Sequence, residues 1–256
     1  MINIDTYAYS NTLKSVHPAE KFSFAMITLV VCLTSPTVIT PLIVLAIMAG
    51  GIIIKAGIPG RFFIRLMLVP LSFLLLSVLT IAFSISTSPT GFWLAQNIAG
   101  LTVGIRWPDL VTSGHIFVKS LGAVSCLYFL ALTTPMTEII TVLGKMRVPV
   151  IITELMVLIY RFIFVFLEIA TTIRRAQSSR LGYVTMKGSF RSLSQLFSAL
   201  FGKVFLKSSE LFDTMASRGY TGEIKVLANK YPVSLKNYLI LILLEMPLGL
   251  LNLLGR

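Results

Sequence analysis

Charged residues are scarce in this chain, and their scarcity excludes an ordinary water-soluble fold. Only 12% of the 256 residues are Asp, Glu, Lys or Arg, against roughly 25% in typical soluble domains. Hydrophobic residues make up 55% of the chain, and the mean hydropathy is +0.87. We therefore expect the chain to lie in a lipid bilayer and to cross it with several helices.

Acidic residues are the scarcer of the two charge types, with 10 Asp and Glu against 22 Lys and Arg and a formal net charge of +12. In a polar protein such a basic excess would suit nucleic acid. In so apolar a chain it is more simply assigned to cytoplasmic loops, where Lys and Arg accumulate in membrane proteins. We therefore expect a basic cytoplasmic region and no nucleic-acid partner.

Cysteine and histidine are rare as well, with two residues of each. Cys32 and Cys126 lie inside apolar runs without CxxC spacing, which excludes a disulfide framework and a zinc site. We interpret them as lipid-facing or packed small hydrophobes. The orientation derived below puts His17 and His115 on opposite membrane faces, whereas a metal path needs several such ligands within reach of one another. We therefore expect this chain to bind no metal and no other cofactor.

Motifs for catalysis are missing from the sequence. It contains no Walker A motif and no GxSxG, HExxH or paired-acid pattern. Because the Walker A loop is what cradles the phosphates of ATP, any ATP must be hydrolysed by another chain. We therefore expect a protein that is not an enzyme by itself.

Apolar runs dominate what is present, and six of them are candidates to span a membrane. They cover residues 22–33, 38–54, 66–85, 116–132, 148–167 and 235–254. A span needs about 20 residues, so the first two runs, separated by Thr34, Ser35 and Pro36, are interpreted as a tight hairpin of short spans. The polar N-terminus shows no cleavable signal peptide, so we expect insertion through the first run.

The distribution of Lys and Arg sets the predicted orientation, because short basic loops stay in the cytoplasm. Lys14 and Lys21 place the N-terminus inside, and the basic segment 55–65 forms the next cytoplasmic loop. The nearly uncharged segment 86–115 then lies outside. The run 116–132 returns the chain to the cytoplasm.

The fifth run, 148–167, conflicts with this orientation if it crosses the membrane. Crossing would place ten basic residues outside, namely Arg174, Arg175, Arg180, Lys187, Arg191, Lys203, Lys207, Arg218, Lys225 and Lys230. Charges also recur every seven residues along one side of this helix, at Glu154, Arg161, Glu168 and Arg175. Each charge would cost several kcal/mol inside lipid. We therefore predict one long helix from Pro149 to about Leu181 at or below the inner face, with its charged side toward water or a partner.

A second long cytoplasmic helix is predicted after Gly188, where apolar residues recur at i, i+3, i+4 and i+7. Gly219 occupies the position just past its end, as a helix-terminating glycine does. The run 235–254 then spans outward. Its single carboxylate, Glu245, is interpreted as neutral or paired with a neighbouring helix.

The predicted fold class is therefore all-α: a polytopic membrane protein with about five spanning helices, or six if 148–167 also crosses. Residues 1–133 form the first membrane helices, 134–234 the cytoplasmic helices and 235–256 the final membrane helix. The membrane is expected to be a plasma membrane, with the N-terminus in the cytoplasm.

Both predicted cytoplasmic helices finish in related sequences, each with a small Ala, then Ser-Arg, then a glycine stop and an aromatic residue. An Arg in the last turn is favoured by the helix dipole and offers a rigid fork of donors, while Ala lets the tip enter a groove. One such sequence is a common helix C-cap. Two in one basic region favour docking to a partner.

This pair resembles the two Ala-Arg-Gly motifs of the transmembrane T component of energy-coupling factor (ECF) transporters, and the wider pattern resembles its cobalt branch, the CbiQ family. Four further segments carry the resemblance through most of the chain: residues 4–8, 16–21, 133–135 and 159–164. In that family the T component joins a membrane-embedded substrate-binding S component to two ABC-type ATPases. The helix tips sit in grooves on the ATPases.

The resemblance implies a set of ATPase-docking residues in this chain. The first motif contains Ala176, Ser179 and Arg180, and the second contains Ala216, Ser217, Arg218 and Gly219. Leu181 stands where the first motif should have glycine, so we expect that helix to run one residue longer, before Gly182.

The implied function is a coupling subunit that transmits ATPase motion to a cobalt-specific S component in a prokaryote, with ATP used by the partner subunits. A T component for nickel or a vitamin remains an alternative, because selectivity lies in the S component. From a different class, a membrane enzyme acting on phosphorylated lipid would use the basic face to grip phosphates, but no nucleophile or acid/base pair is visible. A stand-alone channel fits the long cytoplasmic helices less well.

Overall fold

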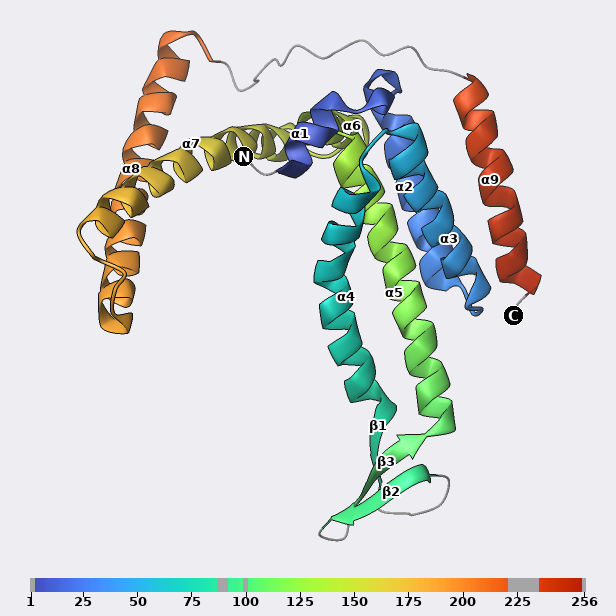
Figure 1. The fold of residues 1–256 in the computed structure, drawn as a ribbon. Coiled ribbons are helices and arrows are strands. Elements are labelled where there is room, and N and C mark those ends of the chain that lie inside the picture. The colour runs from blue at the N-terminus through green and yellow to red at the C-terminus, as the bar shows by residue number, and fades with distance from the viewer. Residues whose placement is uncertain (1–2, 87–91, 99–100, 221–234, 255–256) are drawn as a thin grey trace. The chain divides into compact units, whose positions relative to one another are not determined.

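The computed structural model of the chain describes residues 3–86, 92–98, 101–220 and 235–254, which form two compact units (Figure 1). The first unit is Met1–Ile139 with Lys230–Arg256, and the second is Ile140–Asn229. The sequence-based divisions at 133/134 and 234/235 lie a few residues from these boundaries. Helices predominate in the described residues, which confirms the predicted all-α class apart from one small sheet.

The first unit is a helical bundle arranged around one long helix, α5 (Trp107–Thr133), which packs against the four helices before it. In chain order these elements are α1 (Asn3–Ser10), the 3₁₀ turn η1 (Thr12–Ser15), α2 (Pro18–Thr34), α3 (Ile39–Gly50), the π-helical turn η2 (Gly51–Lys55) and α4 (Gly60–Ala82). Helix α9 (Leu235–Leu254) lies along α2 and α3. The predicted break between the first two apolar runs is confirmed, because α2 ends at Thr34 and α3 begins at Ile39.

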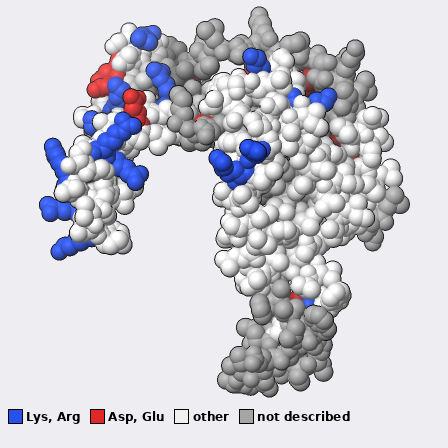
Figure 2. All heavy atoms as spheres, viewed as in Figure 1, with Lys and Arg blue, Asp and Glu red and all other residues white. Residues whose placement is uncertain are grey.

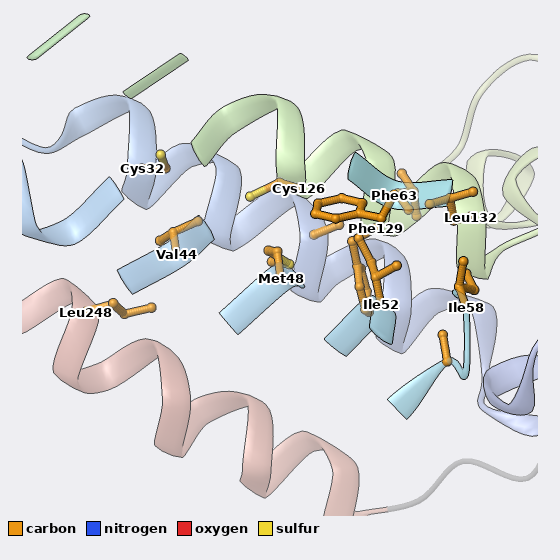
Figure 3. Close-up of a cluster of buried hydrophobic side chains, with 13 residues drawn as sticks. Cys32, Val44, Met48, Ile52, Ile58, Phe63, Cys126, Phe129, Leu132 and Leu248 are labelled. Carbon is orange, nitrogen blue, oxygen red and sulfur yellow. The ribbon is translucent and has the colours of Figure 1, made fainter. Parts of the chain in front are cut away.

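The core of this unit is a cluster of buried side chains from all five apolar helices (Figure 3). Met48 and Ile52 are fully buried, as are both cysteines, Cys32 and Cys126. The interpretation of the cysteines as packed hydrophobes is therefore right. Gly122 lets α5 approach closely, since an added Cβ there would lie 2.8 Å from the Cys32 Sγ and 3.0 Å from a backbone oxygen. Small residues serve the same purpose wherever membrane helices cross at short distance.

A three-stranded antiparallel sheet joins α4 to α5, where the sequence indicated only a long loop. Its strands are β1 (Phe83–Ser86), β2 (Phe92–Ile98) and β3 (Leu101–Arg106), in the order β1-β3-β2. Helix α5 also begins at Trp107, earlier than the predicted start at 116, because Pro108 supplies a helix-start signal in its first turn. Residues 87–91 and 99–100 of the predicted loop lie outside the described residues.

The second unit contains the two long helices that were predicted, α7 (Val150–Ser179) and α8 (Met186–Ser217), which pack against each other. Helix α6 (Met136–Lys145) leads into it and was not predicted. Helix α8 begins before Gly188, because the Thr185 hydroxyl accepts a hydrogen bond from the Gly188 N–H at 3.1 Å and caps the first turn. Lys225 and Lys230, counted among the ten basic residues, lie outside the described part of the chain.

Helix α7 ends in a tight turn that corrects one expectation from the sequence. The Gly182 N–H donates to the Gln177 carbonyl at 2.9 Å, and the Leu181 N–H donates to the Ser178 carbonyl at 3.0 Å. This is a Schellman turn with Arg180 as the C-cap residue. Leu181 adopts the left-handed conformation, with φ of 58°. The expectation that the helix runs one residue longer is therefore wrong.

Helix α8 ends in the same turn. The Tyr220 N–H donates to the Met215 carbonyl at 3.0 Å, the Gly219 N–H donates to the Ala216 carbonyl at 3.0 Å, and Arg218 is the C-cap residue. Gly219 is the left-handed residue here, with φ of 72°, as predicted for its place after the helix end. Leu181 therefore takes the backbone role of Gly219 without glycine's conformational freedom, which costs a side-chain-bearing residue on the order of 1 kcal/mol.

Three described helices are long and apolar enough to cross a membrane: Gly60–Ile81, Trp107–Thr133 and Val150–Ser179. Two shorter apolar helices cover Ile39–Lys55 and Leu241–Asn252. The third long helix is α7, which the sequence placed outside the bilayer. Length and composition permit α7 to cross, but the basic residues after it and its seven-residue charge repeat favour a position outside the hydrocarbon. The location of α7 stays a prediction.

We expect single cysteines at Ser178 and Ser208 to react with thiol reagents only from the cytoplasmic side. Both positions are exposed in the structure, and the background would carry Cys32→Ala and Cys126→Ala. Thr112→Cys, in the segment predicted to lie outside, is the matched control and should react in intact cells. Labelling of Ser178→Cys or Ser208→Cys by an impermeant reagent in intact cells would contradict the orientation.

We predict that Leu181→Gly stabilises the full chain by about 0.5 to 1 kcal/mol. Leu181 is exposed and in the left-handed conformation, which glycine adopts without strain. Thermal unfolding in detergent, followed by helical circular dichroism, measures the change. The reciprocal variant, Gly219→Leu, should lower stability by a similar amount. A loss of stability in Leu181→Gly would show that the side chain contributes more than its backbone costs.

Candidate functional site

The predicted docking residues lie at the exposed ends of α7 and α8. Every one of them is solvent-exposed: Ala176, Ser179, Arg180, Ala216, Ser217, Arg218 and Gly219. We call the two groups, with the Schellman turn that each contains, the first tip and the second tip. The shared turn aligns Arg180 with Arg218 and Ser179 with Ser217. Ala216 lies two residues before its C-cap arginine, at the position that Ser178 occupies in the first tip. Ala176 lies four residues before its own C-cap arginine.

The serines of the two tips make the same hydrogen bond. The Ser179 hydroxyl donates to the Arg175 carbonyl at 2.9 Å, and the Ser217 hydroxyl donates to the Asp213 carbonyl at 2.8 Å. Each hydroxyl bonds the backbone carbonyl four residues earlier in its own helix, as serines in helices commonly do. The neighbouring arginine then carries its guanidinium into solvent beside the negative end of the helix dipole.

The structure does not bring the two tips together. The first tip lies at the α7–α8 connection and the second at the far end of α8 (Figure 1). The first tip packs beside Ser192, and α8 ends 25 residues later at Ser217, so the tips are separated by about 38 Å along α8 at 1.5 Å per residue. A single compact partner site does not fit this separation, whereas two separate grooves do.

A polar network links the first tip to the second turn of α8. The Gln177 side chain donates to the Ser192 carbonyl at 2.8 Å, and the Ser192 hydroxyl donates to the Gly182 carbonyl at 2.9 Å. The Tyr183 hydroxyl donates to the Gln177 side-chain oxygen at 2.7 Å. The approach is close enough that a Cβ on Gly182 would lie 2.6 Å from the Ser192 hydroxyl oxygen. Gly182 is therefore required where it stands, and Leu181 must take the left-handed position.

The second tip is linked to the beginning of α7. The Tyr220 hydroxyl donates to a carboxylate oxygen of Glu154 at 2.9 Å, which raises the pKa of the tyrosine because the bond stabilises its protonated form. The sequence placed Glu154 on a charged side facing water or a partner, and this is wrong for Glu154, which is only 9% exposed. The other charges of the repeat, Arg161, Glu168 and Arg175, are exposed.

Lys and Arg side chains gather over α7 and α8 on the face shown in Figure 2. Those on α8 are exposed: Lys187, Arg191, Lys203 and Lys207. One of them, Lys207, pairs with Glu210 at 2.8 Å, an exposed pair that contributes little to stability. A basic surface of this kind attracts an acidic partner surface and raises the rate of encounter.

Segments that carried the family resemblance meet at the end of α5 in the first unit. The Lys21 ammonium, 3% exposed, donates to the Thr133 carbonyl at 3.0 Å and to the Leu13 carbonyl at 3.3 Å, and it lies 3.8 Å from the Glu138 carboxylate. The Asn11 side chain donates to the carbonyls of Leu132 and Thr133, each at 3.3 Å. Together they cover the carbonyl end of α5, a role that the sequence alone did not indicate.

Polar side chains also hold α9 to α2. The Thr28 hydroxyl donates to the Glu245 carboxylate, and the Asn252 side chain donates to the Thr34 hydroxyl at 2.9 Å and to the Val31 carbonyl at 3.3 Å. The interpretation of Glu245 as paired with a neighbouring helix agrees with this contact. His17 has a structural role as well, because its ring nitrogen accepts from the Ala19 N–H at 3.1 Å and caps α2.

Metal-binding chemistry is not concentrated anywhere in the described residues. No group of three or more His, Cys, Asp or Glu side chains there is placed to hold a metal ion. The described surface carries the two arginine tips and further exposed basic side chains of α8. They suit recognition of another protein.

Comparison with known proteins agrees with this picture. The chain matches the CbiQ family, described as cobalt transport protein, over residues 9–227. It is 33% identical over 242 residues to an uncharacterized protein of Methanocaldococcus jannaschii, covering 94% of this chain and 89% of that one. It is 31% identical over 223 residues to the cobalt transport protein CbiQ of Salmonella typhimurium, covering 87% and 99%. With the CbiQ of Rhodobacter capsulatus it shares 28% identity over 228 residues, covering 89% and 88%. The chain therefore belongs to the CbiQ family of cobalt transport proteins, a family of membrane transport proteins and not of enzymes.

Proposed function

We propose that this chain is the transmembrane coupling component of an ECF-type transporter for cobalt, joining two ABC-type ATPases to a membrane-embedded substrate-binding S component. The observation that carries the proposal is the pair of exposed arginine tips with one shared backbone turn. ATP is bound and hydrolysed by the partner ATPases, and this chain holds no cofactor of its own.

The separation and likeness of the tips support a partner that is present twice. Identical turns aim Arg180 and Arg218 from equivalent backbone positions, so both suit the same kind of groove. A distance of about 38 Å between them, from 1.5 Å of rise per residue, suits two such grooves on separate subunits. A pair of identical or homologous ATPases meets both conditions.

The junction at the end of α5 supports transmission of motion into the membrane helices. Helix α6 begins in the first unit and continues into the second. Its first turn contains Glu138, which pairs with Lys21, and Lys21 also holds the last carbonyls of α5. We therefore propose that this segment of the chain passes motion of the second unit on to α5.

The orientation follows from the basic residues, with the N-terminus and the second unit in the cytoplasm of a prokaryotic cell. Cobalt is the favoured substrate because the family and two of its named relatives are called cobalt transport proteins. A coupling component for nickel or a vitamin is the alternative, since the described residues of this chain hold no metal-binding cluster that would select an ion.

The decisive variant is Arg218→Glu in the chain expressed with its partner subunits. We expect it to release the ATPases and to abolish cobalt uptake while leaving membrane insertion normal, because a reversed charge faces the partner groove. Truncating one member of a buried charge pair costs about 2 to 5 kcal/mol, roughly 30-fold to several thousand-fold in affinity. Arg180→Glu should act in the same way, because its turn has the same geometry.

Two charge reversals away from the tips serve as matched controls. Arg191→Glu and Lys203→Glu change exposed residues of α8 and should each cost less than about 1 kcal/mol. Equal losses in all four variants would mean that general electrostatics, and not tip docking, holds the ATPases. Retention of both the complex and uptake in Arg218→Glu would refute docking at the second tip.

A further inference from the structure

Each tip is followed by the same pair of residues, Gly-Tyr, at Gly182-Tyr183 and Gly219-Tyr220. Both tyrosine hydroxyls donate a hydrogen bond back into the α7–α8 pair, Tyr183 to Gln177 at 2.7 Å and Tyr220 to Glu154 at 2.9 Å. A helix end that protrudes into solvent normally frays, because its last turn has few side-chain contacts. These tyrosines supply such a contact on the chain that leaves each tip.

The contact of the second tip has an unusual acceptor. Glu154 is the only buried residue of α7, whose other side chains are exposed or half-buried. A carboxylate is costly to bury unless hydrogen bonds compensate its lost hydration. A hydrogen bond to a charged group is also stronger than a neutral one. The Tyr220 contact is therefore well suited to hold a fixed geometry.

The same contact joins two residues that are far apart in the sequence. Glu154 lies near the start of α7, and Tyr220 follows the end of α8, 66 residues later. The bond therefore fixes the end of α8 against the other helix of the pair. Tyr183 acts over a much shorter distance, since Gln177 is six residues away, and Gln177 in turn reaches the Ser192 carbonyl of α8.

We propose that Tyr183 and Tyr220 are positioning residues of the two tips, and that Tyr220 acts through the buried carboxylate of Glu154. Arg218 lies two residues before Tyr220 and Arg180 three before Tyr183, so each hydroxyl fixes the backbone that presents an arginine. A tip held in one orientation docks without the entropic cost of being ordered by its partner. This inference rests on the proposed function, because it assigns the tyrosines to the docking of the ATPases.

The two tips differ in how strongly they are held. Tyr220 has a charged, buried acceptor on the other helix, whereas Tyr183 has a neutral acceptor in the same turn. Loss of the Tyr220 hydroxyl should therefore weaken ATPase binding more than loss of the Tyr183 hydroxyl.

The test measures the affinity of the purified, full-length chain for its ATPases in detergent, together with the melting temperature of the chain. Tyr220→Phe should weaken ATPase binding about tenfold, as loss of a charged hydrogen bond implies, and Tyr183→Phe should weaken it less. Tyr9→Phe removes the hydroxyl of a half-exposed tyrosine on α1 and is the matched control, with no change in affinity expected.

A double-mutant cycle separates positioning from a general loss of stability. Glu154→Gln keeps an acceptor oxygen but removes its charge, so it should weaken binding less than Glu154→Met does. Glu154→Met removes the acceptor and should weaken binding about tenfold, with no further loss when Tyr220→Phe is added, because both changes break one bond. Independent losses that multiply to about a hundredfold would overturn the assignment, as would lower melting temperatures with unchanged affinity.

Arg218→Glu, measured in the same assay, distinguishes failure of this inference from failure of the proposed function. Release of the ATPases by Arg218→Glu, with Tyr220→Phe binding as tightly as the unaltered chain, would refute the positioning role and leave the docking function intact. Retention of the ATPases by Arg218→Glu would remove the docking function and the inference with it. Should Glu154→Met fail to fold, Tyr220→Phe against Tyr9→Phe still decides the question.

Discussion

The constraint on which the first unit depends is that every backbone polar group of a membrane helix needs a partner where water is excluded. Helix α5 packs against four other helices, and its carbonyl end is covered by the side chains of Lys21 and Asn11. Both residues come from the N-terminal segment, more than 100 residues away in the chain. These contacts let α5 end inside the protein, directly before the helix that leads into the second unit.

In the second unit the helix ends are exposed instead of covered. The residues of the proposed docking sites lie at these ends. Arg180 and Arg218 stand beside the negative ends of two helix dipoles, in turns stabilised by the same serine and backbone hydrogen bonds. A protein that buried these ends would gain stability but could not present them to a partner, as the proposed function requires. The buried polar contacts lie behind the tips, at Gln177 and Glu154, so the exposed arginines are supported from within.

Much of the fold was predictable because apolar runs and helix stops depend on local sequence. The bounds of α9 and the left-handed Gly219 follow from such local signals. The small sheet, the capped start of α8 and the burial of Glu154 did not, because each depends on residues distant in the chain or on a competing local signal. Leu181 was misjudged for a related reason, since the approach of Gly182 to Ser192 determines which residue takes the left-handed conformation.

The central claim is that this chain couples two ATPases to a substrate-binding membrane subunit. Affinity purification of the full-length chain from native membranes in a mild detergent tests it most directly, with the co-purified proteins identified and quantified by mass spectrometry. The account predicts two copies of ABC-type ATPase and one further membrane protein for each copy of this chain, and cobalt uptake by vesicles that contain the whole assembly and ATP. A chain that purifies alone and by itself sustains cobalt uptake in vesicles would contradict it.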